Sequence, residues 1–242
     1  MIRTASRQTE LELAARYGVV AGMDEVGRGA LAGPVAVGVA VVDGACGEPP
    51  EGLTDSKMLT PRRREGLCGP CRSWSLATAV GWAEARDVDR LGIVGALRLA
   101  GRRALDEVRA AGWAPGVVLL DGSHDWLSAP AGDLFADAGQ ADGSPWPELG
   151  LPVVTRVRAD ASCAVVSAAS VLAKVARDAW MCALDDPGYD WAHNKGYASP
   201  AHVRALAERG PGPLHRVSWR LPGVNPVPPM TPRTSGSGMM VP

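Results

Sequence analysis

Two adjacent acidic residues, Asp24 and Glu25, lie inside the glycine-rich segment GMDEVGRGALAGPV. The two glycines that flank this acidic pair are spaced like the glycines of a nucleotide-binding P-loop. However, Arg28 and Gly29 stand where that loop has a lysine and a hydroxyl residue, and carboxylates inside the loop would repel the phosphates of a nucleotide. We therefore exclude a P-loop and interpret Asp24 and Glu25 as candidate metal ligands.

Two further acidic residues follow apolar runs that predict strands. Asp121 comes after VVLL, and Asp160 comes after VVTRVRA and just before a predicted helix. Each residue alone is typical of a turn or a helix N-cap. If the strand ends meet, however, the four acids cluster, and four carboxylates cannot all stay charged without cations. Mg²⁺ and Mn²⁺ prefer such oxygen ligands, and two ions about 4 Å apart would support phosphoryl chemistry.

This cluster makes one demand on the first strand. Neighbouring strand residues point to opposite faces of a sheet. Asp24 and Glu25 can therefore share a site only if their strand ends or bulges there, which the glycines that follow would permit.

The segments that would position these acids alternate between strand and helix patterns. The predicted strands are VVAGMDEV and PVAVGVAVV, joined by a turn holding Gly29 and Gly33, then SLATAVGWA, VVLLDG and PVVTRVRAD. The predicted helices are LTPRRREGL, a long helix over 87–111 that Asp87 or Asp89 caps and Gly112 ends, SCAVVSAASVLAKVARDAWMCALDD, and a helix over 200–209. This alternation predicts an α/β domain with a mixed sheet.

Three segments fall outside this pattern. Residues 1–17 form a short amphipathic lead-in, residues 124–150 are rich in Pro, Gly, Ala and Asp and predict a mobile surface insertion, and residues 222–242 predict a disordered tail.

Composition limits the classes of function. The net charge of the 242 residues is −1, so a nucleic-acid ligand would need a local basic patch or a metal bridge. The Cys68–Cys71 pair has no second pair with which to complete a zinc site. The chain has no apolar run long enough to span a membrane, so we expect a cytoplasmic protein with reduced thiols and no membrane partner.

The sequence resembles bacterial ribonuclease HII, a type 2 ribonuclease H. The matching stretches are GMDEVGRGALAGPV, LTDSKMLT, VVLLDG, ADASCAVVSAASVLAKVARDAWM, HNKGYASPAH and GPGPLHRVSW, in the order of the family. The resemblance implies one catalytic domain over 18–221 with a ribonuclease H-like fold: a mixed β-sheet flanked by helices, with a helical C-terminal extension. It also implies hydrolysis of RNA in RNA–DNA hybrids and incision on the 5′ side of single ribonucleotides in duplex DNA, leaving 3′-hydroxyl and 5′-phosphate ends.

The resemblance assigns roles to individual residues. It implies that two divalent ions, Mg²⁺ or Mn²⁺, bind to Asp24, Glu25, Asp121 and Asp160. It implies that the backbone of Gly27, Arg28 and Gly29 senses the 2′-hydroxyl, that Tyr197 stacks on the sugar of the following deoxynucleotide, and that Ser56 and Lys57 contact a phosphate of the DNA strand. Ala30 departs from the family pattern, which commonly has proline there.

Several alternatives stay open from the sequence. Lys174 and Arg177 fit a solvent-exposed helix face as well as a role in supporting the site, and we expect His215 and Arg216 to anchor the C-terminal segment. The chain could be a related-fold metal-dependent nuclease with another nucleic-acid substrate, such as a junction resolvase, or a non-catalytic nucleic-acid-binding module. The four acids argue against the module, and we expect a monomer.

Overall fold

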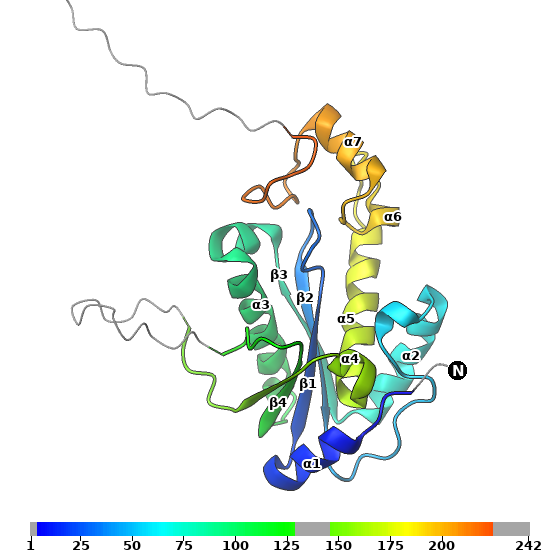
Figure 1. Cartoon of the computed structure of the whole chain (residues 1–242), viewed down its shortest axis with the longest axis vertical. Helices are drawn as coiled ribbons and strands as arrows, with labels where there is room; N and C mark the ends of the chain where they lie inside the picture. Colours follow the sequence, from blue (N-terminus) through cyan, green and yellow to red (C-terminus); the bar gives the residue numbers. More distant parts are fainter. Residues whose placement is uncertain (1–3, 129–145, 225–242) are drawn as a thin grey trace, which may run out of the picture.

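A five-stranded mixed sheet forms the centre of the computed structural model, which describes residues 4–128 and 146–224 (Figure 1). The strands are β1 (Val20–Val26), β2 (Val35–Val42), β3 (Ala77–Ala83), β4 (Val117–Asp121) and β5 (Val153–Arg156), in the order β3-β2-β1-β4-β5. The pairs β1–β2 and β2–β3 are antiparallel, whereas β1–β4 and β4–β5 are parallel. The predicted α/β class and mixed sheet are confirmed.

Helices cover both faces of this sheet. They are α1 (Gln8–Tyr17), α2 (Pro61–Trp74), α3 (Ala85–Ala110), α4 (Ala159–Ser162), α5 (Ala164–Cys182), α6 (Trp191–Asn194) and α7 (Pro200–Arg209), with a short 3₁₀ helix, η1 (Ser56–Met58). Figure 1 shows α3 on one side of the sheet and α5 with α2 on the other. None of the helices in the described ranges is long and apolar enough to cross a membrane.

The alternation of side chains along the strands produces two separate cores. On β1, Ala21 and Met23 pack on the α3 side, whereas Val20 packs on the α5 side. Both faces of the central strands are therefore apolar, as expected for a sheet covered by helices on each side.

Glycine lets helix α5 approach the sheet closely. A Cβ on Gly38 of β2 would lie 2.1 Å from the carbonyl oxygen of Ala169, and one on Gly22 of β1 would lie 2.7 Å from the backbone of Val165. Only glycine avoids these clashes, so the short distance between α5 and the sheet depends on both positions.

We expect Gly38→Ala to lower the free energy of unfolding by about 1–3 kcal/mol, because the methyl group would push α5 off the sheet. Gly44→Ala is the matched control, since a Cβ there meets nothing within 4 Å. Urea unfolding of both variants tests this. A Gly38→Ala protein as stable as the control would contradict the close approach.

The C-terminal segment forms a third small core beyond the end of α5. Leu31 and Ala32, from the β1–β2 connection, pack there against Trp191, Leu206 and Leu221. Figure 1 shows α6 and α7 next to the tip of that connection. The expected helical C-terminal extension is present and holds the glycine-rich turn in place.

The structure corrects several predicted boundaries. Helix α3 begins two residues earlier than predicted, and its N-cap is Glu84, which forms a capping box with Asp87. Asp89 instead accepts hydrogen bonds from the backbone N–H groups of Val217 and Ser218. The strand predicted to reach Asp160 ends at Arg156, because the chain turns through a left-handed residue, Arg158, directly afterwards.

The predicted insertion and tail lie partly outside the described residues. Of the insertion, residues 129–145 are not described, but Trp126, Leu127 and Leu149 are buried in the core on the α3 side. Its ends are thus part of the core, and their assignment to the surface is wrong. The predicted tail lies outside the described residues from position 225 onward.

Candidate active site

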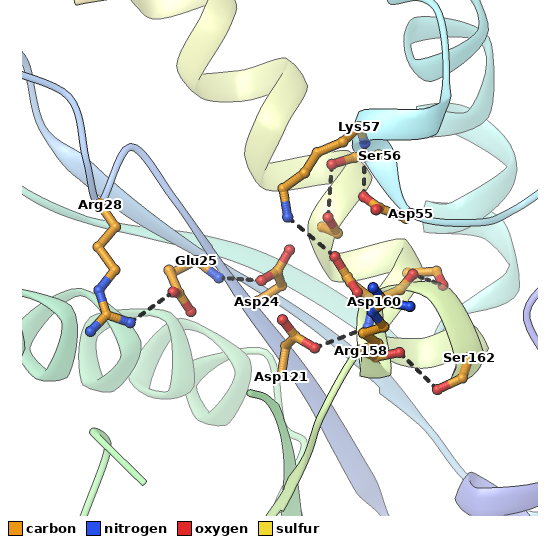
Figure 2. Close-up of polar contacts among 12 residues, drawn as sticks. Asp24, Glu25, Arg28, Asp55, Ser56, Lys57, Asp121, Arg158, Asp160 and Ser162 are labelled. Carbon is orange, nitrogen blue, oxygen red and sulfur yellow. Dashed lines mark hydrogen bonds and ion pairs between the residues drawn. The ribbon is translucent and has the colours of Figure 1, made fainter. Parts of the chain in front are cut away.

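The end of strand β4 defines the position of the candidate site. Strands β1 and β4 run parallel and pair as far as Met23 and Leu120. Strand β4 then ends at Asp121, whereas β1 continues along β2 to Val26. Asp24 and Glu25 therefore follow the last residue of β1 that pairs with β4, and they lie next to Asp121 (Figure 2).

The expected end or bulge of β1 at the acids is absent. Asp24 pairs with Gly38 and Glu25 with Val37 in an unbroken register. The two side chains consequently leave opposite faces of the strand. Both side chains still border the site, because β4 ends at Asp121 and does not cover the edge of β1 beyond that point.

Asp160 reaches the site from the short helix α4 rather than from a strand end. Its backbone N–H donates to Oδ1 of Asp121 over 3.3 Å. An extended residue, Cys163, separates α4 from α5, so the helix predicted from Ser162 begins at Ala164 and Asp160 lies in a short helix of its own. Ser167 of α5 then donates its hydroxyl to the carbonyl of Asp160, which fixes α4 on α5.

Two basic side chains partly neutralise the acids. Nζ of Lys57 lies 3.3 Å from Oδ2 of Asp160, and Nη1 of Arg28 lies 3.4 Å from Oε1 of Glu25. Figure 2 shows the four acids near one another, with Arg28 on the Glu25 side and Lys57 on the Asp160 side. Three elements far apart in the sequence thus supply one acidic cluster.

The acids disfavour one another's charge. Burial raises the pKa of Asp24 well above its ordinary value of 3.8, and the negative charges of the three other acids raise it further. Burial also raises the pKa of Glu25 and of Asp160, with Asp121 adding to each effect. For Lys57, burial alone would lower the pKa, but the surrounding carboxylates outweigh burial and raise it.

The donor set fits a hard divalent cation. All four acidic side chains offer carboxylate oxygens, which Mg²⁺ and Mn²⁺ prefer. Within the described residues, no three acidic, histidine or cysteine side chains are already gathered tightly enough to hold a metal ion. Mutual repulsion of uncompensated carboxylates is a physical reason for this spacing, and a cation would remove that repulsion.

The glycine turn, residues 27–34 between β1 and β2, is held by two buried arginines. Arg216 donates from Nη2 to the carbonyl of Gly27 (2.7 Å) and from Nη1 to that of Arg28 (2.8 Å). Arg177 donates to the carbonyls of Ala32 and Pro34. Both side chains are fully buried, and burial lowers the pKa of Arg216 to about 10, with the charge of Arg177 contributing.

The hydrogen bonds of Arg216 to the carbonyls of Gly27 and Arg28, here called the clamp, determine which backbone groups of the turn can bind a ligand. A trans peptide points its C=O and N–H in opposite directions. With the carbonyls of Gly27 and Arg28 held inward, the N–H groups of Arg28 and Gly29 face away from the clamp, and neither has a partner among the described residues. Gly27 itself requires glycine, since its φ is +81° and a Cβ would lie 2.1 Å from Nε of Arg177.

Sequence reasoning left the role of Arg177 open and did not connect Arg216 to the turn. The structure buries Arg177, which excludes the solvent-exposed alternative and leaves the supporting role. A signal was present, because Arg177 follows Ser170 and Ala173 and precedes Met181 at helical spacing, and all of these are buried. The expected anchoring by Arg216 is observed.

Tyr197 lies directly beside the turn. Its Oη accepts the backbone N–H of Gly27 over 3.1 Å, and its ring lies near Lys174 and Arg177. Its carbonyl accepts from Nδ1 of His202, whose Nε2 shares a hydrogen bond with the buried His215. The tyrosine is therefore fixed at both its hydroxyl and its backbone.

The two residues of the DSK match differ in their surroundings. The hydroxyl of Ser56 is buried and accepts a hydrogen bond from Ser170 over 2.9 Å. Lys57 is largely exposed and faces Asp160. The Lys57 side chain is thus accessible to a ligand, whereas the Ser56 hydroxyl has an internal partner.

Comparison with solved structures defines the class of fold. Ribonuclease H2 from Pyrococcus horikoshii matches with a TM-score of 0.55 and 24% identity, covering 84% of this chain and 94% of that chain. Ribonuclease HII in its complex with PCNA from Archaeoglobus fulgidus matches with a TM-score of 0.59 and 24% identity, covering 83% and 93%. The mixed sheet with its flanking helices is thus the ribonuclease H-like fold.

Sequence comparison then defines the family. A family model described as ribonuclease HII matches residues 21–221. Ribonuclease HII from Streptomyces avermitilis is 46% identical over 203 residues, covering 83% of this chain and 76% of that protein. Ribonuclease HII from Thermus thermophilus is 44% identical over 200 residues, covering 82% and 84%. The chain belongs to the ribonuclease HII family and is an endoribonuclease that acts on the RNA strand of RNA–DNA hybrids.

Proposed function

We propose that this ribonuclease also incises duplex DNA on the 5′ side of a single embedded ribonucleotide, leaving 3′-hydroxyl and 5′-phosphate ends. The observation that carries the proposal is the position of the glycine turn. The N–H groups of Arg28 and Gly29 have no partners among the described residues, and they belong to the turn that follows Glu25, with which the Arg28 side chain forms an ion pair. A hydroxyl on the sugar next to the scissile phosphate can meet these donors, and the 2′-hydroxyl is what distinguishes RNA from DNA.

The proposal assigns two divalent ions, Mg²⁺ or Mn²⁺, to the acids. Asp24, Glu25, Asp121 and Asp160 would hold them, which would remove the repulsion that raises the pKa of Asp24. Such ions, when bound, activate a water molecule and stabilise the departing oxygen. The solved structure of Bst-RNase HIII, of similar fold at a TM-score of 0.51 and 21% identity, is a complex with Mn²⁺.

The remaining residues of the site orient the substrate. Tyr197, held by the N–H of Gly27, would stack on the sugar that follows the ribonucleotide. Lys57 would contact a phosphate through its exposed ammonium group. One chain supplies every residue of this site, which supports a monomer as the working form.

A related-fold nuclease with another substrate is the competing function. It would need the acids but would not need a hydroxyl-sensing turn. The clamp of Arg216 on the turn favours ribonucleotide recognition, because it orients the free N–H groups before substrate arrives.

Cleavage of three matched duplexes tests the proposal: an RNA–DNA hybrid, a DNA duplex with one ribonucleotide, and the same duplex in DNA alone. With Mg²⁺ we expect cutting of the first two, with a single cut 5′ of the ribonucleotide. We expect no cutting of the third duplex, and none of any duplex in chelator. Cutting of the all-DNA duplex, or cutting in chelator, would contradict the proposed mechanism.

A further inference from the structure

A groove of about 900 Å³ lies beside the acidic cluster, between α1, η1 and the β5–α4 connection. The groove is rich in hydrogen-bonding side chains. Those that carry the argument are Ser6, Thr9, Arg156 and Arg158. Hydroxyl and guanidinium donors of this kind bind phosphate oxygens in protein–nucleic acid interfaces.

None of the four acids lines the groove, but residues close in the chain to Lys57 and Asp160 do, so the groove borders the acidic site. Thr54 and Met58 line it on one side and flank Lys57, while Arg158 and Ala161 line it on the other and flank Asp160. The ion pair of Lys57 and Asp160 therefore lies on the boundary between groove and site. Figure 2 shows Arg158 and Ser162 next to Asp160. A strand whose phosphate lies at the acids can thus enter the groove.

The charges of the groove suit an anion. Arg156 and Arg158 are both exposed, whereas Glu12 is the one acid in its lining. Arg156 donates to the Thr9 hydroxyl over 2.6 Å. Among the described residues the Arg158 guanidinium has no partner, and Arg158 keeps a left-handed backbone (φ +57°), a conformation that costs a non-glycine residue free energy. This patch is one local basic surface on a chain of net charge −1, of the kind that binding a polyanion needs.

Two apolar side chains on the rim favour a sugar–phosphate backbone over a free anion. Met58 is 68% exposed and Val157 is 66% exposed, and both line the groove. Neither side chain is buried against another part of the described protein. Apolar groups beside donors match a nucleic-acid strand, in which sugars alternate with phosphates.

We propose that this groove binds the sugar–phosphate backbone of the substrate duplex at phosphates beyond the scissile one. The inference rests on the proposed placement of the scissile phosphate at the four acids. Arg156 and Arg158 make the phosphate contacts, and Met58 and Val157 pack on sugars. The groove then contributes to binding and not to the chemical step.

The test replaces both arginines with glutamine and measures cleavage of an RNA–DNA hybrid at several salt concentrations. We expect KM to rise about tenfold with kcat unchanged. The slope of log KM against log salt should fall by about two, because each neutralised phosphate contributes about 0.9 to that slope. Arg109→Gln is the matched control, an exposed arginine at the far end of α3, and should change neither quantity.

Replacing both arginines with lysine distinguishes a loss of positive charge from a loss of folded protein as the cause of a raised KM. Because lysine keeps the charge, this variant should recover most of the affinity, and its thermal unfolding should match that of the glutamine variant. If KM and the salt slope of the glutamine variant match wild type, or if only kcat falls, the groove proposal is wrong. An inactive wild-type protein would instead contradict the function proposed for the acids.

Neutral methylphosphonate linkages placed singly along each strand identify the contacted strand. At a contacted position the substitution should reduce the difference in KM between wild type and the glutamine variant, because it removes the contact of one of the two arginines. If it does so at no position on either strand, the arginines do not contact the backbone, and the proposal is overturned.

Discussion

We expect Asp24→Asn to abolish cleavage and to raise the stability of the metal-free protein. We expect a loss in kcat of about 10³-fold or more, because the variant removes one of the charges that would hold the cations on which the reaction depends. Asparagine has the shape of aspartate, and its Oδ1 can still accept the N–H of Glu25 that Asp24 accepts over 2.8 Å. The variant therefore changes the charge and leaves the local geometry intact.

The sign of the stability change follows from the raised pKa of Asp24. When a folded acid has a higher pKa than the unfolded one, unfolding releases a proton, so stability falls as pH rises from the unfolded pKa to the folded pKa. Asparagine has no such pH-dependent loss. Without metal, we expect Asp24→Asn to unfold about 2–4 °C above wild type at pH 8, and the gain to shrink toward pH 4.

Calorimetry with chelator and with Mg²⁺ measures this effect. Mg²⁺ should raise the unfolding temperature of wild type, by binding the folded state, and raise that of the variant less. Asp106→Asn, an exposed acid on α3, is the matched control and should leave cleavage unchanged. A variant that still cleaves, or that is less stable than wild type at pH 8, would show that Asp24 is not a crowded metal ligand.

Arg216→Gln has the second largest expected effect. The guanidinium is fully buried and donates to the carbonyls of three residues, Gly27, Arg28 and Gly33. Glutamine cannot reach all three, and each buried carbonyl left without a donor costs about 1–3 kcal/mol. We expect a loss of about 3 kcal/mol in the free energy of unfolding, together with a large loss of activity.

The same change tests whether the clamp orients the turn. In an Asp24→Asn background, binding of a ribonucleotide-containing duplex can be compared with binding of the all-DNA duplex by fluorescence anisotropy. Adding Arg216→Gln should reduce the preference for the ribonucleotide while DNA binding stays the same. Arg204→Gln, an exposed arginine on α7, should keep the preference. An equal loss of both affinities would indicate a structural role alone.

The sheet was predictable from the sequence because its strands are rich in apolar and β-branched residues and are bounded by Gly, Pro and Asp. All five strands lie within the predicted segments, and Asp121 ends β4 as the VVLLDG pattern indicates. The position of Asp160 was predicted less well. The left-handed Arg158 and the break at Cys163 arise from tertiary packing of α4 on α5, which local propensity does not contain.

The support of the glycine turn was not predictable, because it joins residues nearly two hundred positions apart. Burial of Arg177 and Arg216 contradicts the ordinary preference of arginine for the surface. It is possible here because backbone carbonyls accept their donors. The burial of Ser56 against Ser170 likewise depends on the contact between η1 and α5, which no local pattern specifies.

The most direct test of the metal site is a crystal structure with Mn²⁺ and an uncleavable hybrid, examined by anomalous scattering at the manganese edge. Our interpretation predicts two anomalous peaks bounded by Asp24, Glu25, Asp121 and Asp160, with the scissile phosphate between them. Hybrid bound at this edge of the sheet without manganese among these carboxylates, or manganese bound elsewhere, would contradict it.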